Sequence, residues 1–282
     1  MMKTTVSSAT SEVTISDQGP AVLIGERINP TGKKKLSAAL QAGELELLRE
    51  LARSQVEAGA DILDVNVGAS GVDEVAILPE AVQIVMQSVD VPLSIDTDDP
   101  EALAAALKVY RGKAIINSVN GQEDRLERVL PLAKQYGAAV IGLTMDAEGI
   151  PQDAERRVAI AGKILERAAG LGIPTEDIII DGLALTVAAD SKAAWVTLET
   201  IRRVHDTFGV NQTLGASNVS FGLPERDVLN WAFLAMAIAA GVTCPVVNVK
   251  RARPAVLAVD LLLGRDEYAM RYIKAYRQRQ QA

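Results

Sequence analysis

The feature that most constrains the fold is an eightfold alternation of short β-branched apolar runs with longer helix-forming stretches. Runs of this kind begin at residues 21, 62, 92, 114, 138, 177, 213 and 244. Such an alternation predicts parallel strands connected by helices. Eight pairs fit the roughly 250 residues that a (β/α)8 barrel usually occupies. We therefore expect a single α/β domain with TIM-barrel architecture.

Turn and cap residues support this division of the chain. Residues 99–101, Asp-Pro-Glu, are typical of a helix start, with a capping side chain, a proline in the first turn and an acid near the helix dipole. We expect the barrel to occupy residues 21–265. An N-terminal tail over 1–20 precedes it, and a charged C-terminal helix over 266–282 follows it.

Three local expectations follow from the same patterns. Residues 36–58 read as one helix, and the run TLGASNV from residue 213 reads as the seventh strand. The N-terminal tail is either disordered or, through Val13 and Ile15, a short segment that pairs with another strand.

Composition excludes several classes of protein. The 282 residues include one cysteine, Cys244, and one histidine, His205, so the chain holds no internal disulfide and no Cys- or His-based metal cage. The longest apolar run, 231–240, has ten residues, well short of the roughly 18 of a membrane span. Without an apolar secretory segment, the expected location is cytoplasmic. A net charge of −7 argues against a nucleic-acid partner.

Polar side chains gather where the predicted strands end, which is where barrel enzymes carry their chemistry. They are Glu26, Arg27, Asn29, Asp64, Asn66, Asp96, Asn117, Ser118, Asn120, Asp181, Ser217, Asn218, Asn248 and Lys250. Burying so many carboxylates and amides is costly without a polar ligand. A carboxylate accepts two parallel hydrogen bonds from a planar N–C–N edge, so the set favours a pterin- or guanine-like ring. No glycine-rich phosphate cradle accompanies it.

Each of these side chains also has a purely structural reading. A single Asp or Asn at a strand end is as often a helix cap or a turn hydrogen bond as a ligand-binding group. For Asp98 and Asp99 the capping role is the better interpretation.

Seven segments, in chain order, resemble methyltetrahydrofolate:corrinoid protein methyltransferases. They are GERIN (25–29), LDVNVG (63–68), SIDT (94–97), INSVN (116–120), IGLTMDAEGIP (141–151), IDGL (180–183) and GASNVS (215–220). The chain is also similar to the folate-binding module of cobalamin-dependent methionine synthase, within the pterin-binding group that includes dihydropteroate synthase. The resemblance covers about residues 21–265 and implies the same (β/α)8 barrel.

The resemblance implies a set of substrate-binding residues. Asp96, Asn117 and Asp181 would hold the pterin ring, with Asp64 and Asn66 in the same cup. Asn218 matches the asparagine that approaches N5 of the pterin, and Gly215 and Ser217 accompany it. The implied substrate is tetrahydrofolate or its methyl form, and the implied corrinoid belongs to a partner protein. No metal is expected on this chain. We also expect a homodimer, because the breadth of the apolar run 231–240, otherwise an inward helix face, fits a helix buried in a dimer contact.

Two positions depart from the family pattern. Gly182 stands where relatives commonly have proline, so we expect a looser turn after Asp181. Phe221 stands where some relatives place a polar residue near N5, so a second donor is expected to be absent there.

Basic residues are expected on the rim of the barrel. Lys34 and Arg251 follow the first and last strands, which are neighbours in a closed barrel. They would attract the folate glutamate tail or an acidic corrinoid protein. The alternative is a solvated helix start.

The implied reaction is an SN2 methyl transfer between N5 and cobalt, with Asn218 donating a hydrogen bond to N5. Two alternatives remain. A dihydropteroate synthase-like condensation is disfavoured because residues 217–220, Ser-Asn-Val-Ser, lack the basic residues which that enzyme uses after its serine. The other is a folate-binding scaffold without catalysis.

Overall fold

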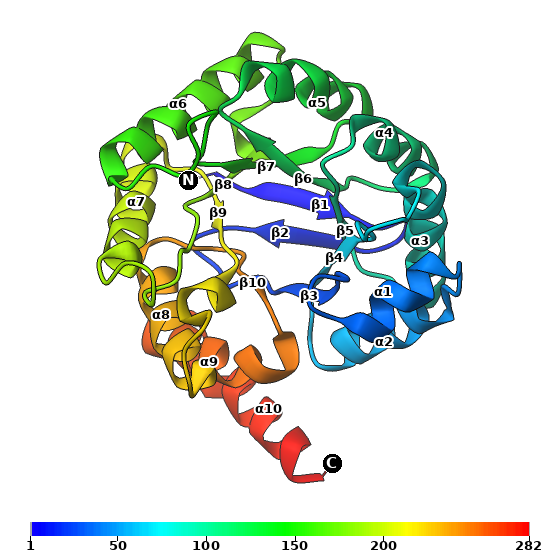
Figure 1. The fold of residues 1–282 in the computed structure, drawn as a ribbon. Coiled ribbons are helices and arrows are strands. Elements are labelled where there is room, and N and C mark those ends of the chain that lie inside the picture. Colours follow the sequence, from blue (N-terminus) through cyan, green and yellow to red (C-terminus); the bar gives the residue numbers. More distant parts are fainter. Residues whose placement is uncertain (1, 282) are drawn as a thin grey trace.

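The computed structural model describes residues 2–281, whose central element is a ring of eight parallel strands surrounded by helices (Figure 1). The strands are β3 (Ile24–Ile28), β4 (Ile62–Asn66), β5 (Leu93–Asp96), β6 (Ile115–Asn120), β7 (Ala139–Leu143), β8 (Ile178–Asp181), β9 (Gln212–Thr213) and β10 (Val246–Val247). They are ordered as in the chain, with β10 beside β3, and a bridge between Gly215 and Val246 closes the ring. The predicted (β/α)8 barrel is confirmed.

The helices form the outer layer. They are α1 (Lys34–Gln41), α2 (Glu46–Glu57), α3 (Glu74–Ser88), α4 (Pro100–Val109), α5 (Glu123–Tyr136), α6 (Ala154–Gly170), α7 (Ala193–Phe208), α8 (Arg226–Ala240), α9 (Val249–Leu262) and α10 (Met270–Gln281), with short 3-10 helices η1 (Thr175–Asp177), η2 (Ala216–Ser220) and η3 (Glu267–Ala269). Helix α4 begins as predicted, because the Asp99 carboxylate accepts a hydrogen bond from the Glu101 amide at 2.8 Å.

Two of the expected elements are wrong. The single helix over 36–58 is two helices, α1 and α2, because Gly43 adopts a φ of +69° and turns the chain between them. The seventh strand ends at Thr213 rather than continuing through TLGASNV. Its remainder, rich in Gly, Ser and Asn, forms η2, where the backbone N–H of Asn218 donates to the Gly215 carbonyl at 3.2 Å.

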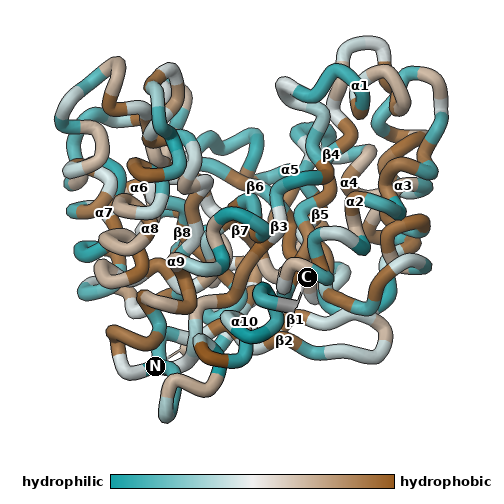
Figure 2. The backbone as a smooth tube through the Cα atoms, turned by 90° about the horizontal axis from the view of Figure 1, so that it is seen from below, coloured by the Kyte–Doolittle hydropathy of each residue, from teal (hydrophilic) through white to brown (hydrophobic). Residues whose placement is uncertain are grey.

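An antiparallel hairpin, β1 (Thr4–Ser7) and β2 (Glu12–Ile15), lies across one end of the barrel. Figure 2 places this hairpin at the end opposite α1. Val6 and Ile15 are fully buried in the same aliphatic cluster as Cys244 inside the barrel, and Asn211 donates hydrogen bonds to both hairpin strands. Residues 4–15 therefore form the pairing segment, and the hairpin covers the end of the barrel at which the strands begin.

Candidate functional site

Three polar side chains stand side by side on neighbouring strands at the open end of the barrel. The strand register pairs Asn66 with Asp96, and Asp96 with Asn117. All three are partly exposed, although the residues that precede them in β5 and β6 are buried. The carboxyl ends of β4, β5 and β6 thus present a row of amide, carboxylate and amide to the opening.

Asp64 lies one layer deeper and is buried. The Asn117 amide donates a hydrogen bond to its carboxylate at 3.0 Å. Burial raises the pKa of Asp64, and burial together with the charge of Asp64 raises the pKa of Asp96. Two carboxyls that resist joint ionisation can share one proton, so the pair offers a donor as well as acceptors to a heterocycle.

Asp181 ends β8, which is separated from β6 by β7. Its carboxylate accepts a hydrogen bond from the Leu183 amide at 2.7 Å, and burial raises its pKa to about 7. The hydrogen bond from Leu183 and, after it, the charge of the Arg157 guanidinium oppose this rise in pKa, because both favour the ionised form. Asp181 is thus a second carboxyl whose proton is easily gained or lost near neutral pH.

Arg157 fixes the turn that follows Asp181. This arginine is fully buried, and one guanidinium nitrogen donates to the carbonyls of Gly182 and Leu183 at 2.8 and 2.9 Å. A second nitrogen donates to the Pro151 carbonyl at 2.8 Å. The turn that contains Gly182 is therefore held by hydrogen bonds from helix α6.

Asn218 is carried by the 3-10 helix η2, not by a strand end as expected. Its side chain is exposed, and within residues 2–281 it has no hydrogen-bond partner. A Cβ on Gly215 would lie 3.1 Å from the Asn218 side-chain nitrogen. Glycine at this position therefore leaves room for the Asn218 side-chain amide. Ser217, beside Asn218, lines a neighbouring cavity. Asn218 is thus free to donate to a ligand.

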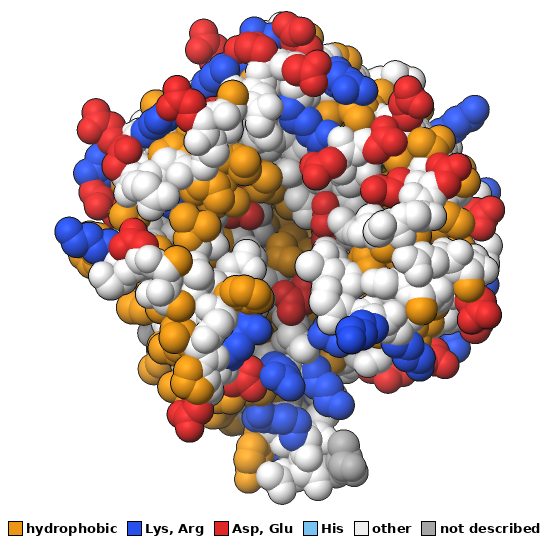
Figure 3. Space-filling model, in the orientation of Figure 1, with side chains coloured by type: hydrophobic (Ala, Val, Ile, Leu, Met, Phe, Trp, Pro, Cys, Tyr) orange, Lys and Arg blue, Asp and Glu red, His pale blue; other side chains and the backbone are white. Residues whose placement is uncertain are grey.

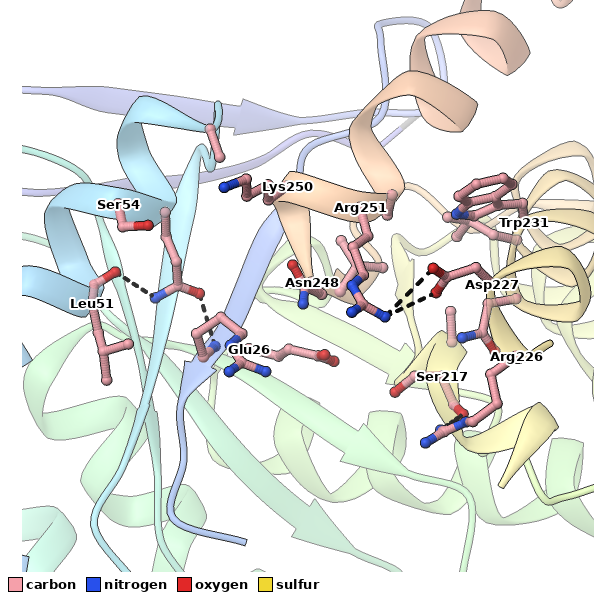
Figure 4. A pocket seen from close by; sticks show the side chains of 18 residues that line it. Glu26, Leu51, Ser54, Ser217, Arg226, Asp227, Trp231, Asn248, Lys250 and Arg251 are labelled. Atoms are coloured by element: carbon pink, nitrogen blue, oxygen red, sulfur yellow. Dashed lines mark hydrogen bonds and ion pairs between the residues drawn. The ribbon is translucent and has the colours of Figure 1, made fainter. Parts of the chain in front are cut away.

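The two basic residues that were predicted on the rim of the barrel lie in different places. Lys34 is exposed at the start of α1. Arg251 faces Asp227 across 3.4 Å and lines a cavity of about 520 Å³, together with Lys250 and Arg226 (Figure 4). Figure 3 shows acidic side chains inside the central hollow and basic side chains on the rim toward α10. The basic part of the rim lies mainly over α8 and α9.

Arg157 was not predicted from the sequence, although its position in the pattern of α6 indicates that it is buried. On α6 it shares the buried face with Ala154, Ile160, Ala161 and Ile164. A single arginine at an apolar position of an amphipathic helix indicates a buried cation with specific partners.

No group of three or more His, Cys, Asp and Glu side chains within residues 2–281 is arranged to hold a metal ion. No helix in the same range is long and apolar enough to cross a membrane.

The chain is similar to known proteins over most of its length. The model of the pterin binding enzyme family matches residues 25–248. The chain is 30% identical over 267 residues to the methylcorrinoid:tetrahydrofolate methyltransferase of Eubacterium limosum, covering 91% of this chain and 96% of that one. It is 32% identical over 262 residues to the methionine synthase of Mycobacterium tuberculosis, covering 88% of this chain but only 22% of that longer protein.

Solved structures of dihydropteroate synthases share the fold. The enzyme from Thermus thermophilus superposes with a TM-score of 0.67 at 25% identity, covering 92% of this chain and 99% of that one. The enzyme from Xanthomonas albilineans gives 0.69 at 20% identity, covering 93% and 98%. At 20% identity the likeness concerns the barrel alone.

Proposed function

Because the chain belongs to the pterin-binding enzyme family and is a methyltransferase related to methylcorrinoid:tetrahydrofolate methyltransferase, we propose that it moves a methyl group between N5 of tetrahydrofolate and the cobalt of a corrinoid on another protein. The observation that supports this most is the row formed by Asn66, Asp96 and Asn117, with Asp181 two strands away. These groups match the donor and acceptor edge of a pterin.

In this proposal the polar cup, which is formed by Asp64, Asn66, Asp96, Asn117 and Asp181, binds and orients the pterin. Asp96, Asn117 and Asp181 hold the 2-amino group, N3 and neighbouring ring positions. Asp64 holds Asn117 in place through their 3.0 Å hydrogen bond. A ring fixed in this way keeps N5 in one position, so the methyl group can be aligned with the approaching cobalt.

The chemical difficulty lies at N5. A tertiary amine is a poor leaving group unless N5 gains a proton or a strong hydrogen bond as the C–N bond breaks. Asn218 is no acid at neutral pH, but its free amide can stabilise the developing charge pattern at N5 while solvent supplies the proton. The corrinoid of the partner supplies or accepts the methyl group, so this chain needs no nucleophile of its own.

Stopped-flow mixing of Co(I) cobalamin with methyltetrahydrofolate, with and without the protein, tests the proposal. We expect the protein to accelerate formation of methyl-Co(III), which is followed by its absorbance. Folate binding without acceleration would favour the non-catalytic scaffold. Condensation of a pterin diphosphate with p-aminobenzoate, with no methyl transfer, would favour the dihydropteroate synthase-like alternative.

A further inference from the structure

A groove lies on the outer wall of the barrel, at the seam between its first and last βα units. It is bordered by α2, which follows β3, and by α9, which follows β10, and α10 lines it as well. Among the described residues, its lining comes from these three helices and from the residue that caps α2, and none comes from a strand. Its volume of about 560 Å³ falls within the roughly 300–1,000 Å³ of small-molecule sites. The groove is therefore large enough for a ligand of its own.

The polar side chains that line this groove make no hydrogen bond or ion pair within residues 2–280, the part of the chain whose side chains are described. They are Ser54, Glu57, Lys250, Arg253, Gln278 and Arg279. By contrast, two arginines of the neighbouring cavity are engaged, since Arg226 donates to the Ser217 carbonyl at 2.7 Å and Arg251 pairs with Asp227. The groove thus keeps its donors available for a ligand.

The charge of the groove is positive, because three of these side chains are cations and one is a carboxylate. Lys250 and Arg253 come from α9, and Arg279 comes from α10. Figure 4 shows Lys250 extending toward α2, whereas Arg251 extends toward Asp227 of α8. Figure 3 shows basic side chains gathered where α10 leaves the barrel. In a chain of net charge −7, this local excess of positive charge favours an anionic ligand.

Arg253 is held in the wall of the groove. Its side chain is only partly exposed. A Cβ on Gly59 would lie 2.5 Å from the Arg253 Nε and 2.7 Å from its Cζ, so glycine after α2 makes room for the guanidinium. Burial raises the pKa of Asp61 in an adjoining small cavity, and Arg253 is one of the groups whose charge opposes this rise, but the two form no ion pair. A partly buried guanidinium with unused donors is a strong binding point for an anion.

The remaining surface of the groove is apolar. Pro254 and Leu257 of α9 contribute most of it, together with Ala58 and the buried Ala275 of α10. An inorganic anion would leave this surface uncovered. An organic anion removes it from water while its charged groups reach the cations.

We propose that this groove binds an organic anion of about nucleotide size that carries two or more phosphate or carboxylate groups. The anionic groups bind Lys250, Arg253 and Arg279, and the apolar part of the ligand lies on Pro254 and Leu257. The ligand bridges α9 and α10, so its binding holds the C-terminal helix against the barrel. None of the groove residues belongs to the polar cup, so the site is independent of the proposed function.

Titration calorimetry of the full chain with three probes, without divalent metal ions, tests the site. The probes are ATP, benzene-1,3,5-tricarboxylate, and tripolyphosphate, which is anionic but has no apolar part. We expect at least one of the two organic probes to bind with a dissociation constant below about 1 mM. Tripolyphosphate should bind at least about fivefold more weakly than that probe, because it leaves the apolar surface in water. The tighter of the two organic probes identifies phosphate or carboxylate as the anionic group.

Substitutions of the cations locate the bound probe. Arg253→Gln and Arg279→Gln should each weaken binding of the tighter probe by about tenfold, the scale of a lost charge-assisted hydrogen bond. Arg279 is exposed on α10, so its variant still decides the matter if Arg253→Gln disturbs the fold. Arg111→Gln, at an exposed position beyond α4, is the matched control and should bind as the unmodified protein does.

Hydrogen exchange of α10 provides a readout that a probe bound elsewhere would not move. With the tighter probe bound, the backbone amides of residues 275–280 should exchange severalfold more slowly, because the ligand ties α10 to α9. The amides of residues 103–108 in α4 should exchange at an unchanged rate.

Three results would overturn this site. They are the failure of both organic probes to bind at millimolar concentration, equal binding by the Arg253 and Arg279 variants and the unmodified protein, and binding of tripolyphosphate as tight as that of the organic probes. Competition with methyltetrahydrofolate separates the groove from the cup. We expect saturating methyltetrahydrofolate to leave probe binding unchanged. Displacement of the probe would assign the groove to the folate and overturn the separate site, while the proposed function would stand.

Discussion

The Asp181 carboxyl is buried, and Asp181 is one of the residues that we propose to bind the pterin. Burial raises its pKa to about 7, from 3.8 for an exposed aspartate. Between these two pH values the folded chain keeps a proton that the unfolded chain releases, so stability falls as pH rises through this window. In the proposed function, the Asp181 side chain is retained for pterin binding although its burial lowers the stability of the fold above about pH 4.

Asp181→Asn tests this account. The neutral amide can keep the 2.7 Å hydrogen bond from Leu183, but it has no charge to bury. We expect the variant to melt at a higher temperature than the wild type at pH 8, with the difference disappearing toward pH 4. Thermal unfolding followed by circular dichroism across this range provides the measurement. A difference that does not change with pH would show that ionisation of Asp181 is not its cause.

Arg157 is the second residue whose burial needs an explanation. Its guanidinium satisfies three backbone carbonyls, and two of these belong to the turn after Asp181. Arg157→Met should lower the free energy of unfolding by about 3 kcal/mol, because buried carbonyls lose charged donors. It should also weaken pterin binding by displacing Asp181.

The neighbouring Arg156 offers a matched control for Arg157. It is exposed and pairs with Asp146 and Glu148 at the surface. Arg156→Met should change the free energy of unfolding by less than about 1 kcal/mol. Denaturant titration of both variants measures the difference, and similar losses would contradict the assigned role of Arg157.

At the scale of elements, the sequence predicts those parts whose structure depends on local pattern. The first six barrel strands contain apolar runs long enough to identify, and Asp99 caps α4 as its sequence indicates. Strands β9 and β10 contain two residues each, and their pairing depends on neighbours in the folded barrel. The break between α1 and α2 at Gly43 and the 3-10 helix η2 depend on the folded structure around them. The periodicity of apolar residues therefore does not predict them.

The hairpin β1–β2 shows how an element remote from the cup can contribute stability alone. Ile15 is fully buried at the end of the barrel opposite the site, whereas Thr14 is exposed on the same strand. Ile15→Ala should lower the free energy of unfolding by about 2–4 kcal/mol, as large-to-small core substitutions do. Thr14→Ala should have little effect. Measured folate affinity should be unchanged in both variants, and a large loss of affinity in Ile15→Ala would contradict this separation.

At the scale of the whole molecule, a hairpin covers one end of the barrel and the polar cup occupies the other. The predicted pterin residues Asp64, Asn66, Asp96 and Asn117 are brought together because parallel strands end at one edge of the barrel. Asn218 could be recognised by resemblance but not placed, since η2 is not a strand. The homodimer stays a prediction. Val228 and Met236, eight residues apart on α8, are exposed and could provide an apolar contact.

We propose that this barrel positions a folate and that a hydrogen bond from Asn218 makes N5 a better leaving group. The most direct measurement is the single-turnover rate of methyl-Co(III) formation at saturating methyltetrahydrofolate, comparing wild type with Asn218→Ala. We predict a rate at least about tenfold lower in the variant, with nearly unchanged folate affinity. An equal rate in the two proteins, at equal folate occupancy, would contradict the claim.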